Sequence, residues 1–205
     1  MSTETVELFV DPTCPFAWMT SRWLLHAAEV RDIRPRFGMM SLAVLNEGRD
    51  VDADYRRHLD DAWGPVRIAE RILRDYGDDA FSRWYTAWGQ RYHVGGDHDR
   101  RAVAEKALAD ADLPAQLMGY YDNVPGDETD KEVRASHEHA QSMVGNDVGT
   151  PVISFGKGIA YFGPVISPAP RGEDAGRLLD AMRTLASIDG VYEVKRARTG
   201  GIDFS

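Results

Sequence analysis

The stretch Asp11-Pro12-Thr13-Cys14-Pro15-Phe16-Ala17-Trp18 decides the fold of this chain. It holds the only cysteine among 205 residues. A short alternating strand, residues 5–10, precedes it, and a helical pattern follows it. Pro15 suits the first turn of a helix, because its missing N–H would be unpaired there anyway. The stretch therefore predicts a thiol where a strand passes into a helix, with Ala17 in the place of the second cysteine of a C-x-x-C pair.

The position of Cys14 predicts a reactive thiol. A free cysteine has a pKa of about 8.5, and the N-terminus of a helix lowers it because the dipole and the free N–H groups favour the thiolate. We therefore expect iodoacetamide to alkylate Cys14 well below pH 8. The alternative is that Cys14 is a small buried apolar residue, as most lone cysteines are. Position alone does not decide between the two.

The overall composition excludes several classes of partner. The formal net charge of −9 argues against nucleic acid or an anionic membrane as the main partner. No apolar run is long enough to span a membrane, and the first residues lack the pattern of a signal peptide. One cysteine cannot form an internal disulfide, which agrees with a reducing compartment. We expect a cytoplasmic protein.

The period of the apolar residues predicts the order of the elements. A second strand is expected over residues 33–42, at a sheet edge or at its own start because of Pro35. Residues 50–147 have a helical pattern. Its expected landmarks are a helix end near Gly64-Pro65, a second end at Gly77, helical faces over residues 81–88 and 102–111, and a capping box of Thr129 and Glu132 opening a helix that runs to Gly145.

After Gly149 the period returns to two. Strands are expected over residues 151–155 and 159–162, joined by a hairpin turn at 156–158. A closing amphipathic helix is expected to have Glu173 and Asp174 in its first turn, with these apolar residues: Leu178, Leu179, Met182 and Leu185. The tail after Asp189 is basic and has no clear pattern. Thr150-Pro151 comes just before a strand, where a cis proline beside the nucleophile is expected; a trans proline opening an edge strand is the alternative.

These motifs together resemble the DsbA-like thioredoxin superfamily and, within it, the mycothiol-dependent nitroreductase family. The resemblance is nearly full length. It rests on the cysteine stretch together with these further blocks of sequence: Thr20-Ser-Arg-Trp23, Met40-Ser-Leu-Ala-Val-Leu-Asn46, Asn46-Glu-Gly-Arg-Asp50, Ala62-Trp-Gly-Pro-Val-Arg67, Asp147-Val-Gly-Thr-Pro151, Phe162-Gly-Pro-Val165 and Pro170-Arg-Gly-Glu173. It implies an α/β thioredoxin-like domain from residues 1–46 and 147–205. A large all-helical insertion, residues 47–146, would lie between the second strand and the cis-proline strand.

The resemblance also implies a chemistry and a set of site residues. The expected enzyme is a thiol-disulfide oxidoreductase whose nucleophile, Cys14, works with mycothiol or a similar small thiol on disulfides or nitroaromatic compounds. His93 is the expected catalytic partner, and His93 or Tyr55 would donate a proton or hydrogen bond to the substrate. The residues expected to bind thiol or substrate are Pro15, Phe16, Ala17, Asn46, Tyr55, Thr150 and Pro151. Each has a duller alternative: a turn residue for Asn46, a core residue for Tyr55 and an exposed loop residue for His93.

Ala17 is the departure from the dithiol members, and it favours a monothiol cycle resolved by a second small thiol. No nucleotide-binding glycine motif is present, so no tightly bound cofactor is expected. No metal is expected either, since His137 and His139 are two apart and do not share a helical face. The partners expected are a small thiol and a small-molecule or disulfide substrate, and a homodimer is allowed.

Two rival functions stay open. The first is an enzyme of the kappa-class glutathione transferase or hydroxychromene carboxylate isomerase type, which activates the sulfur of the small thiol without a protein disulfide. The second is a binding protein that has lost redox function, in which the aromatic side chains of the helical region hold a ligand.

Overall fold

A computed structural model describes residues 3–124 and 127–205. The elements run in the order β1 (Glu4–Val10), α1 (Pro15–Ala28), β2 (Ile33–Met39), α2 (Leu42–Leu45), α3 (Ala53–Asp60), α4 (Trp63–Gly89), the π-helix η1 (Gln90–Val94), α5 (Arg100–Asp110), the 3-10 helix η2 (Ala115–Tyr120), α6 (Thr129–Val144), β3 (Val152–Ser154), β4 (Ala160–Phe162) and α7 (Gly172–Ala186). The strands and the long helices lie where the sequence pattern predicts them. β1 begins one residue earlier than predicted, and the other three strands are one to three residues shorter than predicted.

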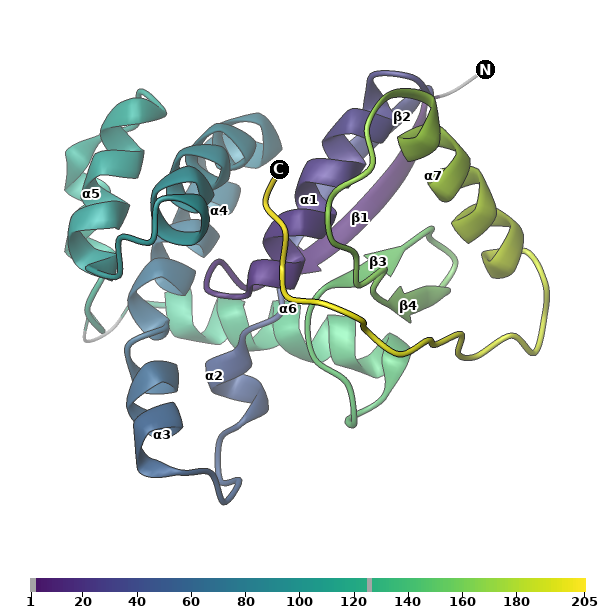
Figure 1. Cartoon of the computed structure of the whole chain (residues 1–205). Coiled ribbons are helices and arrows are strands. Elements are labelled where there is room, and N and C mark those ends of the chain that lie inside the picture. The colour runs from purple at the N-terminus through teal and green to yellow at the C-terminus, as the bar shows by residue number, and fades with distance from the viewer. Residues whose placement is uncertain (1–2, 125–126) are drawn as a thin grey trace.

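The described strands form one sheet in the order β2-β1-β3-β4 (Figure 1). β1 pairs in parallel with β2, while β1 with β3 and β3 with β4 are antiparallel pairs. Because Pro35 cannot donate to a ladder, it fits β2, which lies at the edge of the sheet. The turn between β3 and β4 has positive φ at Gly156, Lys157 and Gly158, so two glycines stand where an ordinary side chain would be strained.

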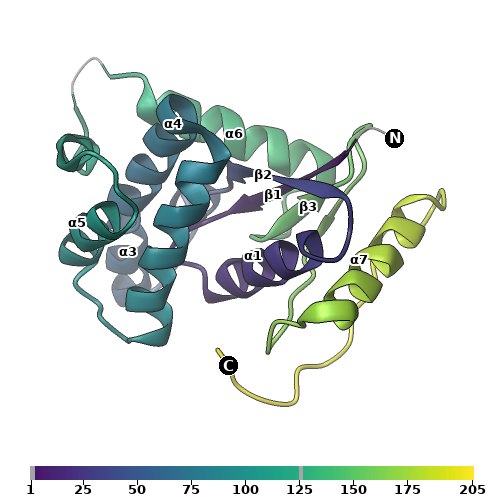
Figure 2. The same cartoon turned by 90° about the horizontal axis from the view of Figure 1, so that it is seen from above.

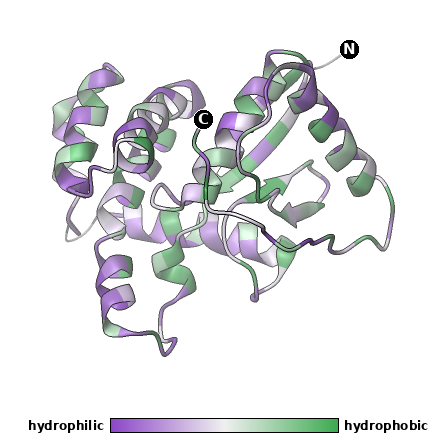
Figure 3. Ribbon diagram, in the orientation of Figure 1, coloured by the Kyte–Doolittle hydropathy of each residue, from purple (hydrophilic) through white to green (hydrophobic). Residues whose placement is uncertain are grey.

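Helices cover both faces of the sheet. Figure 2 shows α1 and α7 on one face and α6 on the other. The main core contains the inward side chains of β1, α1, α4 and α7, and a smaller cluster of Phe9, Met40, Ala140 and Val152 lies on the side of α6. Figure 3 shows the matching pattern, with apolar residues concentrated on the strands and a largely hydrophilic α3.

The helical region corrects two predictions. Gly64-Pro65 does not end a helix but opens α4, because proline is tolerated in a first turn and a Cβ at Gly64 would lie 2.3 Å from the ring of Tyr121. The capping box is absent: Thr129 is already inside α6, and the carboxylate of Asp127 accepts its backbone N–H at 2.8 Å. The break predicted at Gly77 is confirmed, because its φ of 80° kinks α4.

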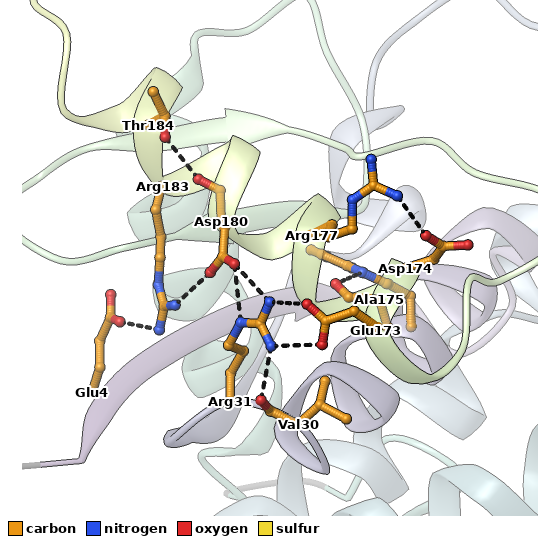
Figure 4. Close-up of polar contacts among 11 residues, drawn as sticks. Glu4, Val30, Arg31, Glu173, Asp174, Ala175, Arg177, Asp180, Arg183 and Thr184 are labelled. Atoms are coloured by element: carbon orange, nitrogen blue, oxygen red, sulfur yellow. Dashed lines mark hydrogen bonds and ion pairs between the residues drawn. The ribbon is translucent and has the colours of Figure 1, made fainter.

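An ionic network joins α7 to the residue after the end of α1 and to the start of β1 (Figure 4). The guanidinium of Arg31, just after α1, lies 2.7 Å from Glu173 and 2.8 Å from Asp180. Arg183 bridges Asp180 to Glu4 of β1. These contacts hold the last helix against the first strand. The chain after this helix then turns back towards Cys14.

Candidate active site

Cys14 is the N-cap of α1. Its backbone is extended, with φ −84° and ψ 115°, and its sulfur accepts the backbone N–H of Ala17 at 3.5 Å. Helix N-caps are polar because an acceptor there satisfies one of the free N–H groups of the first turn. The sulfur takes that place here. Pro15 begins the helix, as predicted, and Ala17 is fully buried beneath the thiol.

The proline loop lies against the other side of the sulfur. The Thr150–Pro151 peptide bond is cis, as predicted, and the thiol of Cys14 donates to the carbonyl of Thr150 at 3.5 Å. The hydroxyl of Thr150 donates to the carbonyl of Phe9 at 3.1 Å, which ties this loop to β1. The fold thus brings residues 136 positions apart in sequence onto one sulfur atom.

Asp11 fixes the loop between β1 and α1. One carboxylate oxygen accepts the backbone N–H of Thr13 at 2.8 Å and its hydroxyl at 2.7 Å, and the other accepts the backbone N–H of Leu42 at 2.7 Å. Asp11 is completely buried, and burial raises its pKa. The carboxylate therefore joins the loop that carries Cys14 to the start of α2.

The thiol is closed off in this conformation. Cys14 is 7% exposed, and burial raises its pKa to about 11. The N–H groups of Ala17 and Phe16 lower the pKa and the charge of Asp11 raises it, but burial outweighs them. The predicted lowering of the thiol pKa is therefore wrong for this conformation. The helix N-terminus is present as predicted, and desolvation exceeds its effect.

His93 supports the Cys14 loop from the π-helix η1, which follows α4. Its Nε2 lies 2.9 Å from the carbonyl oxygen of Pro12, and that oxygen also accepts the indole N–H of Trp88 at 2.8 Å. A carbonyl oxygen can only accept, so Nε2 carries the proton. Burial lowers the pKa of His93 to about 4, which keeps the ring neutral at physiological pH. The ring stacks on Trp18 at 6.1 Å between centroids, so His93 is not a free loop residue.

Asn46 and Tyr55 lie on the helical side of the loop. Asn46 is buried and its amide donates to the carbonyl of Leu42 at 2.8 Å, so it closes α2. Tyr55 is 38% exposed and stacks on His58, which excludes the core alternative. Burial raises the pKa of its phenol, and the charges of Asp11 and Cys14 raise it further. Their roles in binding stay predictions.

A cavity of about 650 Å³ opens in the helical region, apart from these residues. Among its lining residues are His58, Tyr92 and Arg100. None of the site residues predicted from sequence lines it. Arg100 is buried and donates to the hydroxyl of Tyr92 and to the carbonyl of His58.

Sequence reasoning missed three supports of the site: Asp11, Trp18 and Trp88. Asp11 had a signal, because an aspartate two residues before a threonine in a Pro-containing loop is typical of an Asx turn. Its bond to Leu42 had none, since it depends on how β2 leads into α2. The tryptophans looked like core, and they are buried; the indole N–H of Trp88 nevertheless supports the Cys14 loop.

Within residues 3–124 and 127–205, no helix is both long enough and apolar enough to cross a membrane.

Comparison with known proteins agrees with this geometry. A protein of Mycobacterium tuberculosis, the uncharacterized protein Rv2286c, is 31% identical over 202 residues, which is 95% of this chain and 83% of that protein. The cytosolic disulfide reductase DsbM from Pseudomonas aeruginosa has a TM-score of 0.53 at 17% identity, covering 88% of this chain and 99% of that structure. A candidate protein disulfide isomerase from Nitrosomonas europaea has a TM-score of 0.56 at 13% identity, covering 89% of this chain and 98% of that structure.

The two structural likenesses confirm the thioredoxin-like α/β fold of the DsbA type. Residues 13–196 match the Rv2466c-like family, described as mycothiol-dependent nitroreductase Rv2466c. That match begins one residue before Cys14 and includes the Thr150–Pro151 loop and the whole helical region. The chain therefore belongs to the Rv2466c-like family of mycothiol-dependent nitroreductases, and it is a thiol-dependent oxidoreductase.

Proposed function

We propose that this protein is a monothiol oxidoreductase in which Cys14 exchanges with a small thiol of the mycothiol type and reduces disulfides or nitroaromatic-type compounds. The observation that carries the proposal is the placement of the Cys14 sulfur between the first N–H groups of α1 and the Thr150 carbonyl, with Ala17 at the position of a second thiol. A reducing cytoplasm suits such an enzyme, because it keeps the small thiol and the single cysteine reduced.

The first half-reaction is an exchange at sulfur. The thiolate of Cys14 attacks one sulfur of a substrate disulfide, a new S–S bond joins Cys14 to that half, and the other half leaves as a thiolate. A small thiol then attacks the mixed disulfide, releases the Cys14 thiolate and departs as a new disulfide. The amide of Ala17, 3.5 Å from the sulfur, stabilises the thiolate at the start and at the end of the cycle.

The same thiols supply electrons to a nitro group. Oxidising two thiols to one disulfide releases two electrons and two protons, which convert a nitro group into a nitroso group and water. Cys14 and the small thiol provide the two thiols, since the chain has no second cysteine. The DsbM structure has also been solved with GSH, which supports a small thiol as co-substrate in this fold.

The neighbours of Cys14 have distinct proposed roles. Phe16 and the Thr150–Pro151 loop flank the sulfur and bind the small thiol, and Tyr55 on the helical side donates a hydrogen bond to the substrate. Asn46 shapes the turn after α2. The Nε2 proton of His93 is held by Pro12, so His93 acts by placing the Cys14 loop and by offering its ring face.

A second candidate is a transferase or isomerase of the kappa-class type, in which the sulfur of the bound small thiol reacts. The raised pKa of Cys14 favours it, because a neutral thiol can donate a hydrogen bond to the thiolate of the co-substrate. In that case a thioether product forms and Cys14 never becomes a mixed disulfide.

Intact mass measurement separates the two functions. The protein is exposed in parallel to oxidised mycothiol and to oxidised glutathione, and then to the matching reduced thiol. We expect one adduct, on Cys14, with mycothiol, and its removal by reduced mycothiol. Cys14→Ser is the control, and it should take up no adduct and lose thiol-coupled turnover. Unchanged turnover in Cys14→Ser would rule out the exchange mechanism and leave the transferase.

A further inference from the structure

The segment after α7 returns to the active site. Residues 187–205 contain no helix or strand, and the sequence shows no pattern there. In Figures 1 and 2 this segment passes β4 and ends beside the first half of α1 and the end of α4. It is fastened twice on the way: the hydroxyl of Tyr161 donates to the carbonyl of Val191 at 2.8 Å, and the N–H of Asp203 donates to the hydroxyl of Ser167 at 2.6 Å.

Two side chains of this segment lie on predicted site residues. The guanidinium carbon of Arg198 lies 4.9 Å from the ring centroid of Phe16. The ring of Phe204 stacks on His93 with 6.2 Å between centroids and an interplanar angle of 26°. The ring of His93 thus stacks on both Trp18 and Phe204. Phe204 is itself partly buried against the main core.

These contacts flank the thiol. Phe16 follows Cys14 by two residues, and His93 is bonded to Pro12, two residues before it. A segment that touches both therefore lies along the Cys14 loop. Exchange requires the incoming disulfide to reach the sulfur directly, and the sulfur is 7% exposed. The closed arrangement is therefore not the one that reacts.

The segment is held at a few points only. Tyr192 is 88% exposed and Val194 is 75% exposed, and residues 192–201 are all exposed. Ordering such a stretch costs conformational entropy that few contacts offset. Loops of this kind open locally far more easily than the core does. The family match ends at residue 196, so Arg198 and Phe204 lie outside it.

We propose that residues 197–205 compete with the substrate within the same molecule. In the closed form they cover the Cys14 loop, and Phe204 stacks on the ring of His93. In the open form a flat aromatic group of a ligand stacks on that ring instead. The open and closed forms are in equilibrium, and a ligand shifts it by binding the open form only. We call the rings of Trp18 and His93 the aromatic seat. A third ring stacks on His93 there, and in the closed form that ring is Phe204.

The first test measures access to the thiol, which does not depend on the enzymatic reaction. The rate constant for alkylation by iodoacetamide is followed by intact mass in the parent, in Phe204→Ala and in a chain ended after Arg196. Tyr192→Ala is the matched control, because that ring is in the same segment and is 88% exposed. If the open form holds about a tenth of the molecules, removal of the segment raises the rate about tenfold.

We expect the shortened chain and Phe204→Ala to react faster and Tyr192→Ala to match the parent. Equal or slower alkylation in a shortened chain that keeps the circular dichroism spectrum and melting temperature of the parent overturns the proposal. If the shortened chain does not fold, Phe204→Ala decides by the same criterion. Failure of the exchange mechanism would leave these rates unaffected, so the two proposals are tested separately.

The second test addresses the aromatic seat. N-phenyl iodoacetamide and iodoacetamide carry the same reactive group, and only the first can stack on His93. We expect the ratio of their rate constants to rise severalfold in Phe204→Ala, because the vacated ring face then binds the phenyl group. If both rate constants rise equally in Phe204→Ala, so that their ratio is unchanged, the segment only blocks access to the thiol. That result overturns the proposal that a ligand ring stacks on His93.

Discussion

Asp11→Asn should weaken the fold and at the same time activate the thiol. The carboxylate accepts three hydrogen bonds. One oxygen accepts the N–H and the hydroxyl of Thr13, and the other accepts the N–H of Leu42. An asparagine can keep the two bonds to Thr13 with its single oxygen. Its NH₂ group then faces the N–H of Leu42, so a bond is lost and two donors meet.

The loss can be given a magnitude. A buried donor left without its partner destabilises the fold by about 1–3 kcal/mol. The neutral asparagine offsets part of this loss, because it avoids the cost of burying a carboxylate. We expect a net loss of about 2 kcal/mol in the free energy of unfolding. For a chain of this size 1 kcal/mol corresponds to about 2–4 °C, so the melting temperature should fall by about 4–8 °C.

The thiol should respond in the opposite direction. The negative charge of Asp11 raises the pKa of Cys14, so a neutral asparagine lowers that pKa and raises the rate of alkylation at pH 8. Asp127→Asn is the matched control, because Asp127 makes the same bond to the N–H of a threonine two residues later, in the helical region. It should leave the reactivity of Cys14 unchanged.

Scanning calorimetry gives the stability, and the pH profile of alkylation between pH 6 and 11 gives the thiol pKa. A thiol pKa that is unchanged or higher in Asp11→Asn, in a protein that is still folded, would refute the electrostatic argument. A melting temperature equal to that of the parent would refute the account of the Leu42 bond.

Two further predictions concern packing and pH. Gly89→Ala should lower the free energy of unfolding by about 1–3 kcal/mol and displace Trp18, because a Cβ would lie 2.2 Å from its ring. Gly119→Ala is the control, since a Cβ there would have nothing within 4 Å. Equal melting temperatures of the two variants would contradict the close approach at Gly89. Burial and then the charge of Glu132 raise the pKa of Glu70 to about 7, from an unfolded value near 4.5. The fold favours the neutral carboxyl, so its contribution to stability is complete below pH 4.5 and is lost as the pH rises through 7. Glu70→Gln should therefore melt higher than the parent at pH 8 and equally at pH 4; a constant difference between the two proteins across this range would contradict the assignment.

Much of the fold was predictable because its signals are local. The alternation of β1, the proline in the first turn of α1 and the positive-φ glycines of the last hairpin each depend on a few neighbouring residues. The start of α4 was not predictable, because Gly64 is needed for the close approach of Tyr121, which comes from a different part of the chain. The division of the chain at residues 46 and 146 stays a prediction, as does a homodimer.

The site divides in the same way. Sequence alone determined that Cys14 stands at a helix N-terminus, because the end of the strand, Pro15 and the helical pattern lie in adjacent residues. The cis bond at Thr150–Pro151 was one of two alternatives until the structure decided it, and its place beside Cys14 joins residues 136 positions apart. Only the tertiary structure decided the state of the thiol. Its pKa of about 11 comes from desolvation by burial in the folded chain. The ring of Phe204 reaches His93 only because the chain after α7 returns to the site. Burial and long-range contact depend on the whole fold, and they have no local pattern from which to be predicted.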